Sequence, residues 1–406
     1  MNNTKQQLKV CFVSSSFPRY IGDISAPWLL KTARYLTDSG VSMSVFAPSY
    51  KGLKQKECDG IRVYRYRYAP AKYETLTHEE SSGSGNFKGL KHKIAIMAYM
   101  VSGCLNSVYY FLFNKCNIIT VHWPIPHAIF GIIGRLITGS RLVYFFHGYE
   151  LLIVKQYRMF KPFFNFLIGF ADHIVANSSY TGSIVKSEFN IKVPLTVIPM
   201  GSTFLPVADV AVPALNTVKK IKLLFVGKLI ERKGVLYLLK AVKLLKEKRP
   251  DMDLSLTIVG SGDQEPEIRG FIKLNELESI VHMKGALASS SKELSYEYGL
   301  SDIVVVPSFN DAEGNTEALG CVSMEAMAHR KIVIASSIGG IPDVVKDKET
   351  GFLVPEKDPD AIAETISFIS DNYDYASKIA ENGYKYVKDN FSWDNIISKL
   401  LKVYRE

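Results

Sequence analysis

Short apolar runs rich in β-branched residues alternate with longer segments of helical period along the whole chain. Most of these runs are continuously apolar, which is typical of parallel strands that are covered on both faces. Helices between parallel strands produce doubly wound folds, so we predict an α/β protein. The predicted strands are residues 10–13, 43–46, 61–64, 118–121, 142–146, 173–176 and 196–198 in the first half, and 221–226, 254–259, 281–284, 303–306, 332–335 and 351–354 in the second.

The series of strands is interrupted between residues 202 and 220, a stretch with two prolines and no clear period. The strand that follows begins IKLLFVGK, which resembles the LKVCFVS near the start of the chain. A chain of 406 residues is long enough for two or three domains. We therefore predict two similar α/β domains in tandem, residues 1–205 and 206–390.

Residues 94–113 form an uncharged segment that is long enough to span a bilayer. A helix that is apolar on most sides can equally be a buried core helix. We expect a core helix; a lipid-facing helix and a spanning one are the alternatives. The apolar positions at helical spacing are Ile94, Met97, Val101, Leu105, Val108 and Leu112, and the interruptions are Ser102, Gly103, Asn106 and Ser107.

The formal net charge of +9 favours anionic partners, which include nucleic acid, an anionic membrane face and phosphate-bearing small molecules. The chain has no zinc-binding pattern, no RNA-binding aromatic run and no Arg-rich arm, so we expect no nucleic acid. Its five cysteines are widely spaced, which fits a reducing cytoplasm. Basic residues at 88–93 and 155–161 adjoin apolar segments, so we expect a cytoplasmic protein that associates peripherally with the inner face of a membrane.

Open parallel sheets bind ligands beyond the carboxyl ends of their strands, so the residues after each strand are candidates. The loop after the first strand holds Gly22, where backbone N–H groups can approach a phosphate. His147 follows the fifth predicted strand, and His122 and Trp123 follow the fourth. An ordinary loop and structural side chains are the alternative interpretation of these positions.

After residues 221–226, Gly227 permits a turn in the segment GKLIERKG. Lys228, Arg232 and Lys233 then place three cations at one junction between a strand and a helix. Cations beside a helix N-terminus oppose the helix dipole, so we expect a compensating anion such as a diphosphate. A solvated basic turn is the alternative.

The segment PSFNDAEGNTEALGCVSMEAMAHR follows residues 303–306. A helix that begins near Leu319 would point free N–H groups at this loop. Glu325, two turns along, is a carboxylate among apolar neighbours and is costly to bury without a partner. The two hydroxyls of a ribose could satisfy it, whereas a half-exposed Glu on an amphipathic helix is the alternative.

The motif Glu-x7-Glu is present as EALGCVSME, from Glu317 to Glu325. FPRYIGD, HGYE, ADHIVANSS, VIPMG, VGKLIERKG, IVGSGD and TGFLVPEKDPDAIA accompany it. With these motifs, nearly the whole chain resembles family 4 of the retaining glycosyltransferases, which have the GT-B fold. The resemblance implies two Rossmann-like doubly wound domains facing a central cleft, with residues 391–406 as a C-terminal helix that crosses back to the first domain.

The resemblance also implies a role for each matching residue. Glu325 would bind the donor ribose, and Glu317 would contact the hydroxyls of the transferred sugar. Lys228 and Lys233 would hold the diphosphate, and His147 would lie beside the reacting sugar. Further donor contacts would come from Gly22, Gly227, Gly320 and Cys321, and acceptor contacts from His122 and Trp123.

Two departures from the family pattern concern the diphosphate and the acceptor. The family usually has Arg where Lys228 stands; Lys offers a point charge instead of a bidentate fork, so we expect the contact to persist with altered geometry. Met200, Ser202 and Thr203 stand where the family often has Asn before the glycine of VIPMG and Asp shortly after it. The contribution of that loop to acceptor binding is therefore open.

The expected reaction moves a sugar from a nucleoside diphosphate sugar to an acceptor hydroxyl with retained configuration, in surface polysaccharide or glycolipid assembly. The partners would be the donor and a glycan or lipid-linked acceptor. A phosphorylase or sugar-nucleotide epimerase of related fold, and a non-catalytic sugar-nucleotide-binding protein, are the alternatives. We expect no metal or other cofactor, because Asp251 and Asp253 precede residues 254–259, at the end of the strand opposite the ligand edge.

Overall fold

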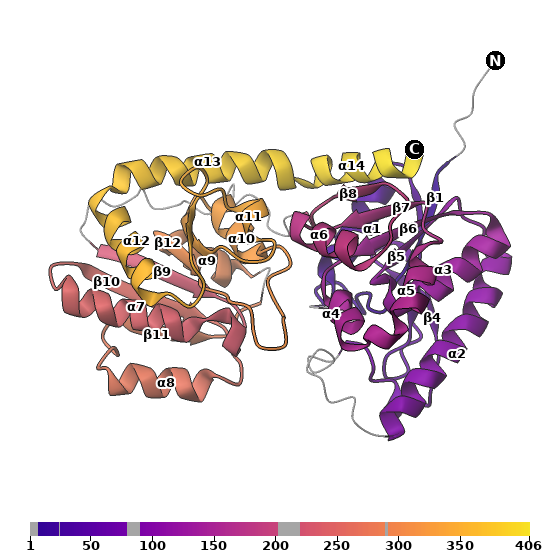
Figure 1. The fold of residues 1–406 in the computed structure, drawn as a ribbon, viewed down its shortest axis with the longest axis horizontal. Coiled ribbons are helices and arrows are strands. Elements are labelled where there is room, and N and C mark those ends of the chain that lie inside the picture. The colour runs from indigo at the N-terminus through magenta and orange to yellow at the C-terminus, as the bar shows by residue number, and fades with distance from the viewer. Residues whose placement is uncertain (1–6, 24, 79–89, 202–219, 289–290) are drawn as a thin grey trace, which may run out of the picture. The chain divides into compact units, whose positions relative to one another are not determined.

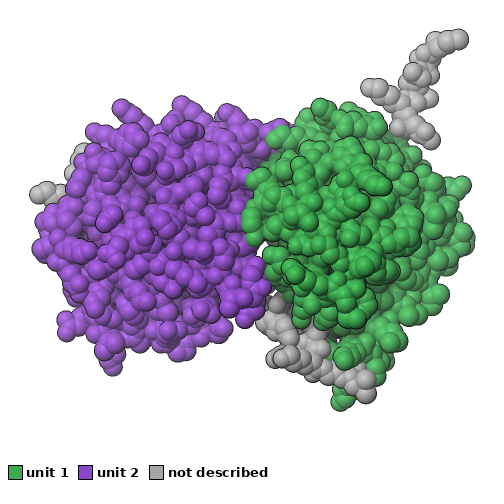
Figure 2. All heavy atoms as spheres, viewed as in Figure 1, with its two compact units in different colours: residues 1–201, 396–406 green, residues 202–395 purple. Residues whose placement is uncertain are grey.

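The computed structural model describes residues 7–23, 25–78, 90–201, 220–288 and 291–406. The chain divides into two compact units (Figure 2): unit 1 contains residues 1–201 and 396–406, and unit 2 contains residues 202–395. The predicted boundaries were 205/206 and 390/391. Most of the predicted linker, with Ser202 and Thr203, lies outside the described residues.

Unit 1 is built on an eight-stranded sheet in the order β3-β4-β2-β1-β5-β6-β7-β8, parallel except for the pairing of β3 with β4. Figure 1 labels β1 and β4 to β8 of this sheet. The short β3 is missing from the prediction, although the dipeptide Asp59-Gly60 is a known hairpin-turn signal. Both residues have positive φ angles in the structure. The strands are β1 Lys9–Val13, β2 Ser42–Pro48, β3 Glu57–Cys58, β4 Ile61–Tyr66, β5 Ile118–His122, β6 Arg141–Phe146, β7 His173–Ala176 and β8 Leu195–Val197.

Helix α3 packs between α2 and α5 on one face of this sheet. Ile119 and Val121 of β5 contact α3 at its glycines, and Thr120 therefore points to the opposite face. There the hydroxyl of Thr120 lies 3.0 Å from that of Tyr404 in α14. The helices are α1 Pro27–Asp38, α2 Leu90–Phe113, α3 Pro124–Thr138, α4 Tyr149–Gln156, α5 Lys161–Ile168, α6 Ser179–Glu188 and α14 Trp393–Arg405, with 3-10 turns η1 Ala71–Tyr73 and η3 Arg158–Phe160.

Unit 2 contains a six-stranded parallel sheet in the order β11-β10-β9-β12-β13-β14. Each strand predicted from the sequence is present in one of the two sheets, with bounds that differ by two residues at most. The strands are β9 Lys220–Val226, β10 Asp253–Val259, β11 Val281–Gly285, β12 Ile303–Val306, β13 Ile332–Ser336 and β14 Phe352–Val354. The helices are α7 Val235–Lys248, α8 Glu265–Leu274, α9 Lys292–Leu300, α10 Cys321–Ala328, α11 Ile341–Val344, α12 Pro359–Asp371 and α13 Tyr373–Phe391, with the 3-10 turn η4 Glu231–Lys233.

Helix α2 differs from the prediction of a buried core helix. Among the described residues it is the one helix long and apolar enough to cross a membrane, and only 28% of its apolar window is buried. Its small and polar residues face the protein, which leaves most of its large apolar side chains on the outside.

The expected return of the C-terminal helix to the first domain is confirmed, since the chain from Ile396 onward belongs to unit 1.

Replacing Tyr404 by Phe should destabilise unit 1 by about 1 kcal/mol, because it leaves the buried Thr120 hydroxyl without its partner. Urea denaturation would measure the loss. Tyr375→Phe, on an exposed ring of α13, is the control and should change little. Equal effects of the two variants would contradict the pairing.

Candidate active site

The loops that follow β9 and β12 meet at the carboxyl edge of the unit 2 sheet, because these strands are neighbours. The backbone N–H of Phe309 donates to the carbonyl of Arg232, which ties the two loops together at 2.8 Å. Gly260, after β10, lets its loop approach the end of β9 closely: a Cβ on Gly260 would lie 1.8 Å from the Gly227 oxygen. The candidate donor residues of this half thus belong to one packed set of loops.

Glu317 is the centre of the polar contacts at this edge. Its Oε1 accepts from Arg232 Nη1 at 2.9 Å, from Ser308 Oγ at 3.2 Å and from Lys233 Nζ. Burial raises the pKa of Glu317, but the charges of Lys233 and Arg232 outweigh it, and the pKa is lowered from its ordinary value. The carboxylate is therefore ionised at neutral pH.

This arrangement corrects one step of the sequence argument. The three cations after β9 suggested an anion from outside the chain, yet Glu317 compensates Arg232 and Lys233 from within it. Lys228 is exposed, and no carboxylate of the described residues lies within ion-pair distance of it. Of these three cations, Lys228 is thus the one that no carboxylate of the described residues compensates.

The glycine pair after β13 positions Glu317, and the sequence analysis did not single it out. Gly340 N–H donates to the carbonyl of Glu317 at 2.8 Å. A Cβ on Gly339 would lie 2.1 Å from the Glu317 oxygen, and one on Gly340 would lie 2.1 Å from the Ala318 oxygen. Only a residue without a side chain permits this approach, so the glycine pair in SSIGGIP was the available signal.

Helix α10 begins at Cys321, two residues later than predicted. Gly320 precedes it with a φ of 79°, a left-handed conformation that L side chains rarely adopt, so the helix cannot extend back to Leu319. Gly320 and Cys321 accordingly lie at the start of the helix, where backbone N–H groups lack partners within the helix.

Glu325 has a protein partner that the sequence did not indicate. Tyr298 of α9 is fully buried, and its Oη donates to Glu325 Oε2 at 2.8 Å. Burial raises the pKa of Glu325 to about 8, against the opposing effects of the Tyr298 hydrogen bond and of the Lys233 charge. Near neutral pH, Glu325 is therefore largely protonated in the free protein.

In unit 1, His122 is the last residue of β5 and His147 follows the adjacent β6; they contact each other, with His122 Nδ1 3.1 Å from His147 Nε2. Burial lowers the pKa of His122 to about 3 and that of His147 well below its ordinary value, so both rings are neutral. The other ring nitrogens, His122 Nε2 and His147 Nδ1, are buried without a partner. Whichever tautomers are present, one buried N–H donor and one acceptor stay unsatisfied.

Aromatic rings enclose this histidine pair. Trp28 and Trp123 lie 4.6 and 4.7 Å from His147 between ring centroids, and Phe145 stacks on it at 4.8 Å. Trp28, on α1, was not among the predicted residues. The enclosure explains the low pKa values and holds the imidazoles in a fixed orientation.

Gly22 lies in the loop after β1 with a φ of 93°, and a Cβ built on it would meet no atom within 4 Å. An ion pair and two hydrogen bonds to backbone carbonyls hold this loop. Arg19 binds Asp23 through two nitrogens at 2.7 and 2.8 Å, and Arg65 donates to the carbonyls of two residues of the loop, at positions 17 and 18. The backbone at Gly22 is thus fixed, and the space beside it is open.

The Asp251 and Asp253 pair lies at the amino end of β10, as predicted, opposite the loops described above. Asp251 pairs with Arg249 at 3.2 Å, and Asp253 pairs with Lys220 at 3.1 Å. In the part of the chain that the structure describes, no group of three or more His, Cys, Asp or Glu could hold a metal ion. Whether the protein needs a metal stays a prediction.

Comparison with known proteins extends these observations. The family model described as Glycosyltransferase Family 4 matches residues 93–202, and the one described as Glycosyl transferases group 1 matches residues 212–386. An uncharacterised glycosyltransferase of Methanocaldococcus jannaschii is 32% identical over 45% of this chain, a match that spans only 44% of that protein. D-inositol 3-phosphate glycosyltransferase of Corynebacterium urealyticum is 26% identical over 93% of this chain and 89% of its own length.

Among solved structures, Anabaena HepE in complex with UDP superposes with a TM-score of 0.70 over 98% of this chain and 99% of HepE, at 17% identity. Another structure of HepE contains UDP-glucose. The two parallel-sheet units thus define the GT-B fold of glycosyltransferases. The chain belongs to glycosyltransferase family 4, because the two family models together match most of it.

Replacing Gly340 by Ala should destabilise unit 2 by about 1–3 kcal/mol, because the new methyl group would overlap the Ala318 carbonyl and displace the Glu317 backbone. Chemical denaturation would measure the change. Gly270→Ala in α8 is the matched control, since a Cβ there meets no atom within 4 Å, and it should be neutral or slightly stabilising. A Gly340→Ala variant as stable as the unmodified protein would refute the close approach.

Proposed function

We propose that the protein transfers a sugar from a nucleoside diphosphate sugar to an acceptor hydroxyl with retention of anomeric configuration. The observation that carries this proposal is the cluster of Glu317, Arg232 and Lys233 at the carboxyl edge of β9 and β12, with Glu325 on the following helix. UDP and UDP-glucose in the HepE structures support a nucleotide-sugar donor for this chain.

Glu325 would bind the ribose of the donor. An ionised carboxylate can accept one hydrogen bond from each hydroxyl of a vicinal diol, and Tyr298 leaves the second carboxylate oxygen available for this. Because burial keeps the free carboxyl protonated near neutral pH, ribose binding would stabilise the ionised form and release a proton.

The diphosphate would meet Lys228, Lys233 and the backbone N–H groups of Gly320 and Cys321. The Lys233 ammonium has three donors, so it can contact a phosphate while it keeps its bond to Glu317. These groups would stabilise the negative charge that grows on the departing diphosphate. In unit 1, Gly22 would let the backbone approach a phosphate, since its surroundings are open.

In unit 2, Glu317 would contact the hydroxyls of the transferred sugar. In unit 1, His147 would bind a sugar hydroxyl, as the family resemblance implies. His122 would then hold the His147 ring, rather than contact the acceptor as the sequence analysis proposed, and Trp123 would form part of the wall.

The proposed reaction exchanges two bonds on one face of the sugar. The bond from the anomeric carbon to the diphosphate oxygen breaks as the acceptor oxygen bonds to the same carbon, and the acceptor proton passes to the departing phosphate. Double displacement would need a free carboxylate beside the anomeric carbon, and the sequence identifies no such group. The acceptor would belong to surface polysaccharide or glycolipid assembly.

Nucleotide binding should depend on pH through Glu325. Affinity for UDP, or for whichever of UDP, GDP and ADP stabilises the protein most, should rise between about pH 6.5 and about pH 8.5 as the carboxyl ionises. Calorimetry in buffers of different ionisation enthalpy should detect proton release near pH 7. Glu325→Gln should abolish the proton release and weaken binding by about 1.5–3 kcal/mol.

Two further variants serve as controls for this measurement. Tyr298→Phe removes a donor to the carboxylate, so it should raise the pKa of Glu325 and move the affinity profile to higher pH. Glu349→Gln, on an exposed carboxyl of unit 2, should change neither the affinity nor the proton release. If all variants bind as the unmodified protein does, Glu325 does not bind ribose.

Transfer should proceed in EDTA, because Lys228 and Lys233 supply positive charge for the diphosphate and the Asp251–Asp253 pair lies at the other end of β10. The measurement is product formation from the best donor with and without chelator. Loss of activity that manganese restores and that Asp253→Ala reproduces would overturn the metal-free proposal.

A further inference from the structure

Helix α2 presents its large apolar side chains to the outside of the protein. Six of them lie at intervals of three or four residues and form one continuous row, here called the α2 stripe: Ile94, Met97, Val101, Leu105, Val108 and Leu112. Each is at least 40% exposed, and Met97 and Leu105 reach 67%. An exposed apolar surface of this length marks a contact with another apolar phase.

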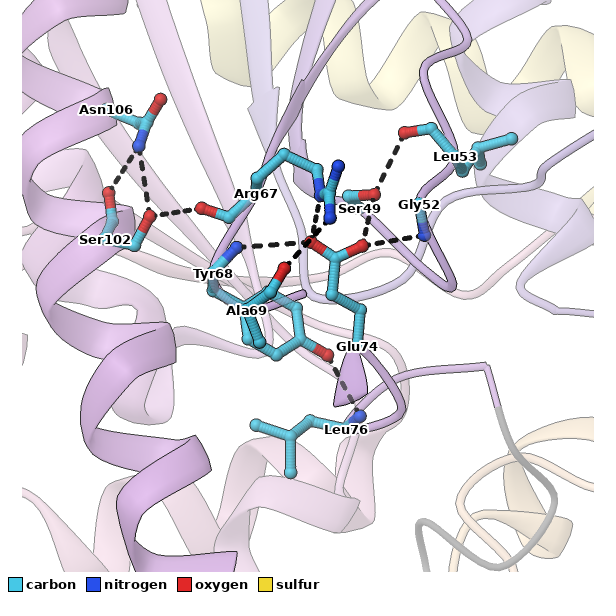
Figure 3. A network of polar contacts seen from close by, with 10 residues as sticks. All are labelled: Ser49, Gly52, Leu53, Arg67, Tyr68, Ala69, Glu74, Leu76, Ser102 and Asn106. Atoms are coloured by element: carbon cyan, nitrogen blue, oxygen red, sulfur yellow. Dashed lines mark hydrogen bonds and ion pairs between the residues drawn. The ribbon is translucent and has the colours of Figure 1, made fainter. Parts of the chain in front are cut away.

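The opposite face of α2 packs against the protein and carries three buried aromatic rings, Tyr99, Tyr110 and Phe111. Its polar residues are bonded to neighbouring segments (Figure 3). Ser102 Oγ donates to the carbonyl of Arg67, and Asn106 Nδ2 donates to the Ser102 carbonyl at 2.9 Å. Tyr64 Oη donates to Asn106 Oδ1 at 2.9 Å. At Gly103, the helix approaches the Phe130 ring so closely that a Cβ would lie 2.3 Å from it.

The loop after β4, in which the Arg67 carbonyl accepts the bond from α2, is held by a network of hydrogen bonds centred on Glu74. Glu74 is fully buried, and its carboxylate accepts from Ser49 Oγ at 2.9 Å, from Gly52 N–H at 2.8 Å and from Arg67 Nε (Figure 3). The inward side of α2 is bonded to this network and buries three aromatic rings, so turning the α2 stripe inward would break these bonds and expose the rings. The α2 stripe is therefore a fixed outer surface.

The charged residues of α2 and its flanks are all basic, since residues 90–122 contain no acidic residue. Elsewhere in the same helical layer, Arg135 is paired with Asp172 and Lys161 with Glu188. Lys91 and Lys93 lie exposed at the start of α2, and Lys115 lies exposed just after its end. Lys88, which contributed to the sequence prediction, lies outside the described residues. The partner of this surface must therefore be apolar and tolerate or attract positive charge.

The rest of this helical layer has the same character. Leu136 of α3 and Phe166 of α5 are exposed large apolar side chains, and Met159 and Phe160 are exposed in η3. Lys155 and Arg158 lie beside them in the sequence. The layer α2–α3–α5 thus combines exposed apolar side chains with basic residues.

We propose that the α2 stripe is a membrane-docking surface that lies in the interface of an anionic lipid bilayer. A second copy of the chain would bring an equally basic surface against this one, so the charge disfavours a dimer here. Spanning would require breaking the Ser102 and Asn106 bonds and exposing polar groups to hydrocarbon. Burial of the apolar side chains in the bilayer interface accounts for the exposed α2 stripe, and attraction to anionic headgroups accounts for the lysines beside it.

Flotation of the full chain with phosphatidylcholine vesicles, with and without phosphatidylglycerol, tests the proposal. The unmodified protein should float with phosphatidylglycerol vesicles. The double variant Val101→Asp, Leu105→Asp should bind roughly tenfold more weakly or worse, because it removes two apolar side chains from the interface. Leu274→Asp in α8 is the matched control, since this leucine is 84% exposed on unit 2, and its binding should not change.

The charge contribution is tested separately. Lys91→Glu with Lys93→Glu should weaken binding to phosphatidylglycerol vesicles roughly tenfold or more. Lys385→Glu with Lys388→Glu, on exposed lysines of α13, is the control and should not weaken it to that extent. Salt should weaken binding without abolishing it, because the apolar contact is insensitive to salt.

Three outcomes would overturn the proposal: equal vesicle binding by the stripe variant, dissociation of a dimer by that variant without loss of vesicle binding, or resistance of the bound protein to alkaline extraction, which would indicate a spanning helix. Circular dichroism and nucleotide affinity of the stripe variant should match the unmodified protein. Since flotation requires no donor or acceptor, the result is independent of the proposed transfer reaction.

Discussion

Parallel strand pairing is the constraint on which the rest of this structure depends. It leads each chain segment from the carboxyl end of one strand, through a helix, to the amino end of the next, so the loops after all strands gather at one edge. In unit 2 this brings the loops after β9, β12 and β13 into contact, although they are far apart in the sequence. The close approach of Gly339 and Gly340 to the backbone at Glu317 then fixes the charged centre.

The two glutamates at this edge, Glu317 and Glu325, have different surroundings and different pKa shifts. Glu317 is kept ionised by two cations and a hydroxyl, whereas Glu325 has one neutral donor and a pKa raised by burial. Two carboxylates eight residues apart thus have opposite protonation states near neutral pH. Glu317 stays ionised in the free protein, whereas the ionisation of Glu325 would depend on whether a ligand is bound.

The candidate site residues of unit 1 are neutral histidines, in contrast to the charged residues of unit 2. His122 and His147 are surrounded by aromatic rings, and each keeps one ring nitrogen without a partner. In the same unit, α2 differs from an ordinary surface helix, because it is apolar on its outer side as well as on its inner side. The inner side buries aromatic rings and bonds its polar groups to the protein, and the outer side carries the α2 stripe.

The sequence alone determined every strand except the two-residue β3, because buried parallel strands require continuous apolar runs that can be recognised locally, and β3 is short and antiparallel. It also placed Lys228, Lys233, Glu317 and Glu325 at strand ends and on the following helix. Tertiary structure decided what depends on contacts between distant segments: the pairing of Tyr298 with Glu325, the compensation of Lys233 by Glu317, and the orientation of α2. The spacing of the α2 stripe showed that its apolar residues share one face, but a period cannot tell whether that face points inward or outward. The tertiary contacts decided the direction: the hydrogen bonds of Ser102 and Asn106 to β4 and its neighbouring loop, and the burial of the aromatic rings of α2 on the same side.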